Sequence, residues 1–97
     1  MTFIDPALEV AGEIASDLLG LGEEIVSELR DRGEARIPVS SSAIAELMYR
    51  AHDRFLTILF QDGTRYGIDG FPALELERWL SSGSIGGYFN RNIRGRY

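Results

Sequence analysis

The stretch RFLTILFQDGTRYGID, residues 54–69, predicts a β-hairpin and sets the fold class of the chain. Residues 54–60 are rich in β-branched and aromatic side chains, which favour strands. Asp62-Gly63 is a frequent hairpin turn, because glycine readily adopts the positive φ that such turns need. The 54–60 strand is apolar on both faces, so we expect both faces to be covered.

Before this hairpin, residues 44–49 alternate moderately between apolar and polar, which predicts one more strand. Together with the hairpin, this strand predicts a three-stranded antiparallel β-meander over 44–69. Downstream, Leu76 and Trp79 mark one side of a helix that runs to about residue 81. After a break, Ser84 can cap a short final helix with Phe89 and Ile93 inward. Residues 34–43 predict a polar connection with a short extended piece at 37–39. The predicted class is α+β.

The N-terminal residues predict an amphipathic helix. Asp5 can cap it, Pro6 suits its first turn, and Gly33 can end it. Gly20 and Gly22 weaken its middle, so residues 6–32 form either one helix or a helical pair. Apolar residues recur at spacings of three and four and form a candidate partner-helix face: Ile4, Leu8, Ala11, Ala15, Leu18, Ile25 and Leu29.

The charge of the chain, −5 overall, is divided by position. Residues 1–34 carry nine acids and two arginines, a net −7, whereas residues 35–97 carry six acids and eight arginines, a net +2. All basic residues are arginine. We therefore divide the chain into an acidic helical extension, 1–34, and an α+β domain, 35–97.

The composition argues against catalysis and cofactors. The chain has no cysteine, and its single histidine, His52, lies in a predicted turn. Transition-metal sites would have to rely on carboxylates alone. The glycines near residues 20 and 86 lack the spacing of phosphate-binding loops. No apolar run is long enough to span a membrane and no signal peptide is recognisable, so a cytoplasmic protein is expected.

A nucleic-acid hypothesis comes from the arginines and aromatic residues of the second half. Arg91 and Arg94 lie among aromatic residues in the C-terminal stretch, and Arg65 precedes Tyr66 on a predicted strand. Arginine contacts phosphates and aromatic rings stack on bases in single-strand recognition. The sequence pI of about 4.8 and the acidic helix count against this hypothesis.

Four stretches in this order, PVSSSAIAELMY, LTILFQDGTRY, GFP and SGSIGGYFNRNIRGRY, resemble the KTSC domain over about residues 37–97. The family is named for the C-terminal end of certain lysyl-tRNA synthetases and also occurs alone in bacterial and phage proteins. The resemblance implies that the C-terminal stretch is a fold element, and the synthetase link implies a role in RNA binding. The family's paired tyrosines appear here as Tyr66-Gly67-Ile68, without the second ring.

Two functions follow as hypotheses. The first is a non-catalytic interaction module whose N-terminal stripe pairs with a second copy or another protein, in the cytoplasm or in a virion as part of a larger assembly. Its structural alternative places the stripe on the sheet, near Phe55 and Leu59. The second function is binding of RNA or other single-stranded nucleic acid, with four candidate contacts: Arg65, Tyr66, Arg91 and Arg94.

Overall fold

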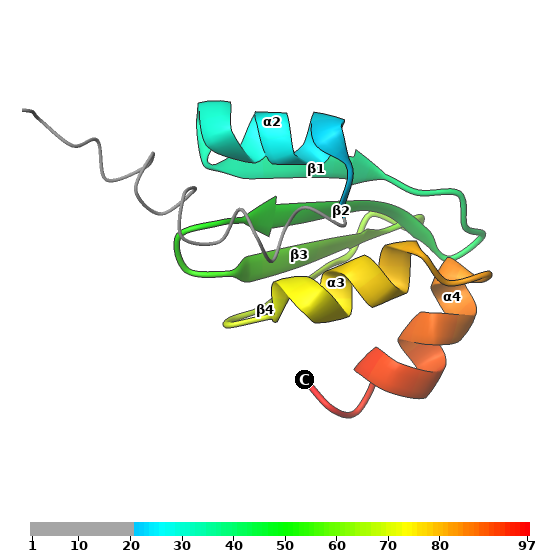
Figure 1. The fold of residues 1–97 in the computed structure, drawn as a ribbon. Coiled ribbons are helices and arrows are strands. Elements are labelled where there is room, and N and C mark those ends of the chain that lie inside the picture. Colours follow the sequence, from blue (N-terminus) through cyan, green and yellow to red (C-terminus); the bar gives the residue numbers. More distant parts are fainter. Residues whose placement is uncertain (1–20) are drawn as a thin grey trace, which may run out of the picture.

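The computed structural model describes residues 21–97, which form a four-stranded antiparallel sheet and several helices (Figure 1). The strands are β1 (Glu34–Pro38), β2 (Ile44–Arg50), β3 (Phe55–Phe60) and β4 (Arg65–Ile68). They pair in the order β1-β2-β3-β4, so each strand lies beside its neighbour in sequence. The predicted α+β class and the meander are confirmed.

The predicted number of three strands is wrong, because β1 adds a fourth at the edge of the sheet. β1 pairs with β2 from Glu34↔Arg50 to Pro38↔Glu46. Only Ala35 and Ile37 of this strand are buried. Two inward side chains are too short a pattern to distinguish an edge strand from a connection, and the pairing with β2 decides the structure.

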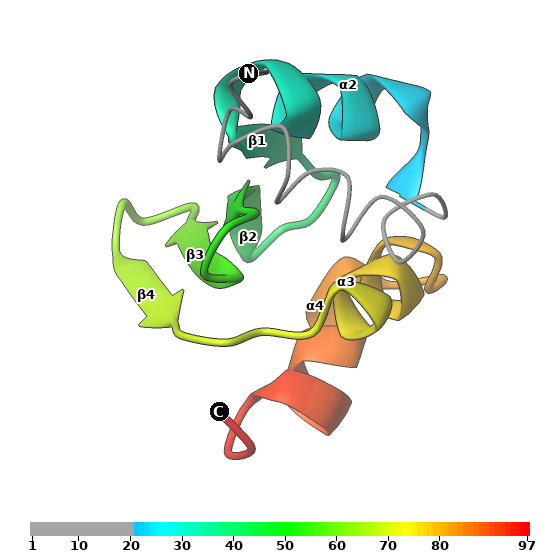
Figure 2. The same ribbon diagram turned by 60° about the vertical axis from the view of Figure 1, so that its left-hand side comes forward.

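The sheet has an inner and an outer face. Paired residues of the four strands place Ala35, Tyr49, Leu56 and Ile68 in one row of the inner face, and all four are buried. Figure 2 shows the helices on this side of the sheet. The expectation that both faces of β3 are covered is not met within residues 21–97: the outer side chains of β3 are half-buried and lie outside the core.

The N-terminal helix of the described part, α2 (Glu23–Arg32), packs on β1 through Val26 and Leu29. The predicted stop at Gly33 is confirmed, because Gly33 has φ 77° and its N–H bonds to Leu29 O at 2.9 Å. Gly22, at φ 100°, directly precedes the helix. Residues 1–20 lie outside the described part. The helix therefore shares the core of the domain that follows it.

The C-terminal helices complete the inner layer. They are α3 (Ala73–Leu80), α4 (Ile85–Tyr88) and the π-helix η2 (Phe89–Ile93). The predicted cap is confirmed: the Ser84 hydroxyl accepts a hydrogen bond from Gly87 N at 3.0 Å. Trp79 is buried and donates to Ile85 O at 2.9 Å, which joins α3 to α4. Ile93 is buried and Phe89 packs on the core, so both point inward as predicted.

Candidate functional site

Two cavities adjoin along the C-terminal helices and together form a groove. The first, which we call the aromatic cavity, has a volume of about 470 Å³. The end of β3, β4 and η2 enclose it. Its main lining is apolar and comes from Phe60, Tyr66, Phe89, Ile93 and Tyr97.

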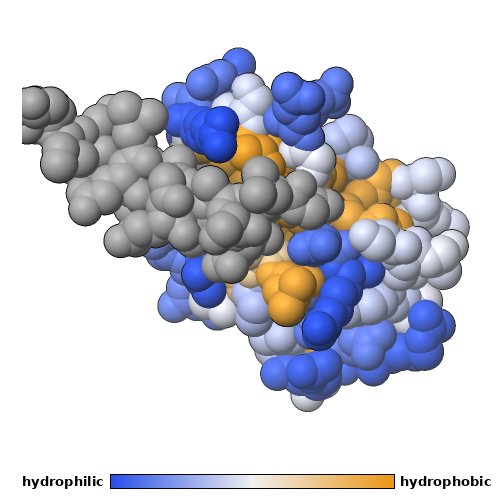
Figure 3. All heavy atoms as spheres, in the orientation of Figure 1, coloured by the Kyte–Doolittle hydropathy of each residue, from blue (hydrophilic) through white to orange (hydrophobic). Residues whose placement is uncertain are grey.

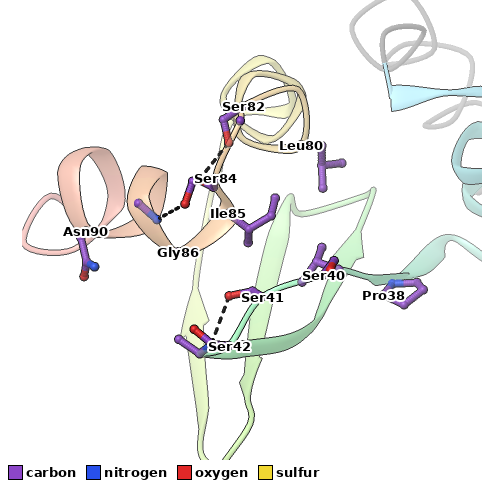
Figure 4. Close-up of a pocket in the computed structure, with 14 residues that line it drawn as sticks. Pro38, Ser40, Ser41, Ser42, Leu80, Ser82, Ser84, Ile85, Gly86 and Asn90 are labelled. Atoms are coloured by element: carbon purple, nitrogen blue, oxygen red, sulfur yellow. Dashed lines mark hydrogen bonds between the residues drawn. The ribbon is translucent and has the colours of Figure 1, made fainter.

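The second cavity, which we call the serine cavity, has a volume of about 760 Å³. It lies between the 40–42 loop and the turn that leads into α4 (Figure 4). Ser41 shapes the loop, because its hydroxyl accepts hydrogen bonds from the backbone N–H groups of Ala43 and Ile44, both at 3.2 Å. Ser82 and Ser84 lie across the cavity from it (Figure 4). The lining is therefore polar but uncharged.

The two cavities share three lining residues, Ala43, Gly86 and Asn90. Asn90 is exposed on η2, and Gly86 lies in the first turn of α4. Among the described residues, no aspartate or glutamate lines either cavity, and Arg94 is the one cation that does. The groove is thus suited to an anionic or neutral ligand with an aromatic or apolar group.

The structure brings two of the four predicted nucleic-acid contacts together. Tyr66 and Arg94 line the aromatic cavity, where Tyr66 is 43% exposed. Arg65 lies on the outer face, because neighbouring residues of a strand point to opposite sides. Arg91 is exposed on η2 and lines neither cavity. A single surface therefore holds Tyr66 and Arg94 but excludes Arg65.

Two residues of the predicted partner-helix face, Leu29 and Ile25, lie in the described part of the chain. The Leu29 side chain is 1% exposed and belongs to the core, and Ile25 packs against the same core half-buried. Both are on the inner side of the sheet, away from Phe55 and Leu59. The other five residues of the predicted face lie outside the described residues. On the face drawn in Figure 3, hydrophobic surface appears as patches between hydrophilic side chains.

The C-terminal end is held in place by Glu75 of α3, whose side chain is 11% exposed. Tyr88 and Tyr97 donate hydrogen bonds from their hydroxyls to its carboxylate, and the Arg96 guanidinium lies 3.6 Å from it. Burial, together with the negative charge of Glu75, raises the pKa of both tyrosines. This anchoring fixes the Tyr97 ring as one wall of the aromatic cavity.

No catalytic constellation stands out in residues 21–97. His52 is exposed in the β2–β3 turn, as predicted. Within this range, no group of three or more histidines or acids is placed to hold a metal ion, and no buried polar side-chain atom lacks a hydrogen-bond partner. The described helices include none that is long and apolar enough to cross a membrane.

The sequence patterns did not identify Phe60, Gly86 and Asn90, among others, as residues of the groove. Phe60 was placed only in a strand, and the glycines near residue 86 were noted only because they lack the spacing of a phosphate-binding loop. The available signal was the stretch SGSIGGYFN, residues 82–90, in which small residues precede two aromatics and an asparagine. Small residues leave the α4 backbone accessible to a ligand.

Comparison with known proteins agrees with this architecture. A family model described as the KTSC domain matches residues 40–97. The crystal structure of a KTSC domain protein from Yersinia pestis is similar, with a TM-score of 0.60 and 33% sequence identity, over 65% of this chain and 89% of that chain. No curated protein matches the chain. Helix α2 and strand β1 precede the residues that the family model matches.

Proposed function

The chain belongs to the KTSC domain family, and we propose that it is a non-catalytic interaction module that binds single-stranded nucleic acid in the groove. The observation that carries the proposal is that Tyr66 and Arg94 line one cavity although they are far apart in sequence. An exposed tyrosine ring offers a stacking surface for a base, and a guanidinium beside it can contact the adjacent phosphate.

The size and lining of the aromatic cavity support this ligand class. Its volume of about 470 Å³ is within the usual range for small ligands, roughly 300–1,000 Å³. The rings of Phe60 and Phe89 meet edge to face, with their centroids 5.6 Å apart, and form an apolar wall of the cavity. A nucleobase is flat and apolar on its faces, so it gains from contact with such a wall.

Among the described residues, part of the negative charge lies away from the groove. Four acids, Glu23, Glu24, Glu28 and Asp31, surround a surface hollow on α2. Figures 1 and 2 both show α2 at the end of the molecule opposite to the C-terminal helices. At physiological salt, screening limits repulsion to about 8 Å. Arg91, Arg94 and Arg96 are all exposed at the opposite end.

Titration of a fluorescently labelled single-stranded oligonucleotide with the full chain tests the proposal. We expect binding that weakens with salt. The logarithm of the binding constant should fall linearly with the logarithm of the salt concentration. In Arg94→Gln the magnitude of this slope should be smaller by about 0.7, the contribution of one phosphate contact on a single strand. The matched control is Arg65→Gln, which removes an exposed arginine from the outer face and should leave the slope unchanged.

Two results would contradict the proposal. One is the absence of binding at low salt by a chain that melts cooperatively. The other is an equal loss in both arginine variants, since that would show attraction by overall charge without a site. Binding of an acidic peptide in place of the oligonucleotide would assign the groove to a protein partner.

A further inference from the structure

We infer that the bound strand crosses from the aromatic cavity into the serine cavity over Gly86, so that the smallest fully bound ligand has two nucleotides. This inference rests on the proposed function and adds the path of the ligand. The two cavities meet at Gly86, Ala43 and Asn90. An extended ligand that occupies both must pass this junction.

The junction is narrow. A Cβ built on Gly86 would come 3.6 Å from the Ser41 hydroxyl oxygen, which is ordinary van der Waals contact. One added methyl group would therefore occupy the space between α4 and the 40–42 loop without distorting either. The gap itself admits no more than a methyl group, so the strand crosses on the solvent side of this junction, where the absence of a side chain on Gly86 leaves room for it.

The two cavities differ in the chemistry that they offer. The aromatic cavity contains stacking surfaces and, in Arg94, a cation for phosphate. The serine cavity has hydroxyls and the Asn90 amide but, within the described residues, no charged side chain. Hydroxyls and amides both donate and accept hydrogen bonds, which matches sugar hydroxyls and base edges. We therefore assign a stacked base and its phosphate to the aromatic cavity and the neighbouring sugar and base to the serine cavity.

Asn90 is placed to read the ligand at the crossing. Its side chain is exposed, lines both cavities and, among residues 21–97, has no hydrogen-bond partner. An amide presents one donor group and one acceptor and can pair with a base edge. Asn90→Ala should therefore reduce discrimination between bases more than it reduces affinity for a mixed sequence.

The test compares nucleotide length in the full chain and in Gly86→Ala. For the wild type, a dinucleotide should bind about tenfold more tightly than a mononucleotide, because the second cavity adds contacts. Gly86→Ala should keep the mononucleotide affinity and lose the gain from the second nucleotide. Gly86 has no positive φ, and alanine is favoured over glycine in helices, so the variant should fold.

Ser27→Thr is the matched control. It also adds one methyl group, but on an exposed residue of α2 that lines neither cavity, so the length dependence should stay that of the wild type. Ser41→Thr narrows the same junction from the loop side and keeps the hydroxyl, so it should reproduce the effect of Gly86→Ala. This second variant keeps the test valid if Gly86→Ala fails to fold.

The outcomes separate the inference from the proposed function. If the wild type binds neither nucleotide nor longer strands, the proposed function fails and this inference fails with it. If strands bind at the groove but Gly86→Ala and Ser41→Thr keep the wild-type gain from the second nucleotide, the crossing is wrong while the proposed function stands. If the gain disappears in both variants and persists in Ser27→Thr, the path over Gly86 is supported.

Discussion

The Tyr66 hydroxyl donates a hydrogen bond to the main-chain oxygen of Tyr97 at 2.6 Å. This bond joins the edge strand β4 to the C-terminal end of the chain, and both rings line the aromatic cavity. The Tyr97 ring also packs against the ring of Phe71 in the core, with the two ring centroids 5.0 Å apart. The cavity wall is thus positioned before any ligand arrives, which reduces the entropy lost on binding.

Two substitutions of Tyr66 should separate the contribution of its hydrogen bond from the contribution of its ring. Tyr66→Phe keeps the stacking surface and should bind an oligonucleotide within about twofold of the wild type, while it loses roughly 0.5–1.5 kcal/mol of stability. Tyr66→Ala also removes the ring and should lose about 1–3 kcal/mol of binding energy. Fluorescence titration measures affinity and urea unfolding measures stability. Equal affinities for the two variants would show that the ring does not contact the ligand.

Phe89→Ala tests whether the C-terminal stretch is part of the core. Phe89 is half-buried, and its ring stacks on that of Trp79 with the ring centroids 6.1 Å apart. Because it is not fully buried, the variant should lose about 2 kcal/mol, less than the roughly 3–5 kcal/mol of a fully buried phenylalanine. Arg91→Ala, an exposed change on the same helix, is the control. An unchanged melting temperature for Phe89→Ala would show that η2 does not support the fold.

Stability should fall at alkaline pH because of Tyr88 and Tyr97. Their pKa values lie above the ordinary 10.0, first because burial desolvates the hydroxyls and then because Glu75 is close. A raised folded-state pKa contributes stability that is complete below pH 10 and is lost as pH rises through that pKa. Urea unfolding at a series of pH values measures this. The double variant Tyr88→Phe/Tyr97→Phe should show a smaller decline, and a profile identical to the wild type would refute the assignment.

At acid pH the corresponding group is Asp53. The Arg50 guanidinium donates hydrogen bonds to its carboxylate at 2.9 and 2.6 Å and lowers its pKa from 3.8 to about 2. A lowered pKa contributes stability that is present above pH 3.8 and is lost as pH falls through about 2. Asp53→Asn should remove this part of the pH dependence. Thermal melts between about pH 5 and pH 2 measure the difference; parallel curves for variant and wild type would contradict the prediction.

Much of the fold could be predicted from local patterns, and β1 shows where such patterns are insufficient. Alternation and turn residues placed β2, β3, β4 and α3 correctly. Strand β1 ends at Pro38 and has only two inward side chains, so its identity depends on pairing with β2. That pairing is a tertiary contact, which no local pattern contains.

The candidate site could be predicted only in part. Arg65 and Tyr66 are neighbours on a strand, so alternation alone could have assigned them to opposite faces. The proximity of Tyr66 to Arg94 could not be read in the same way, because it depends on how η2 docks against the sheet. In η2, Arg94 N bonds to Phe89 O at 2.8 Å, a five-residue spacing that no helical periodicity rule anticipates.

The central claim, that a single strand occupies the groove, is tested most directly by the backbone-amide NMR spectrum of the full chain during titration with a short single-stranded oligonucleotide. We expect signals of Gly86, Asn90 and Arg94, which line the groove, to shift progressively. Signals of Arg36 and Glu46, an ion pair on the outer face, should stay in place. Absence of any shift at saturating oligonucleotide, or shifts centred on the outer face of the sheet, would contradict the claim.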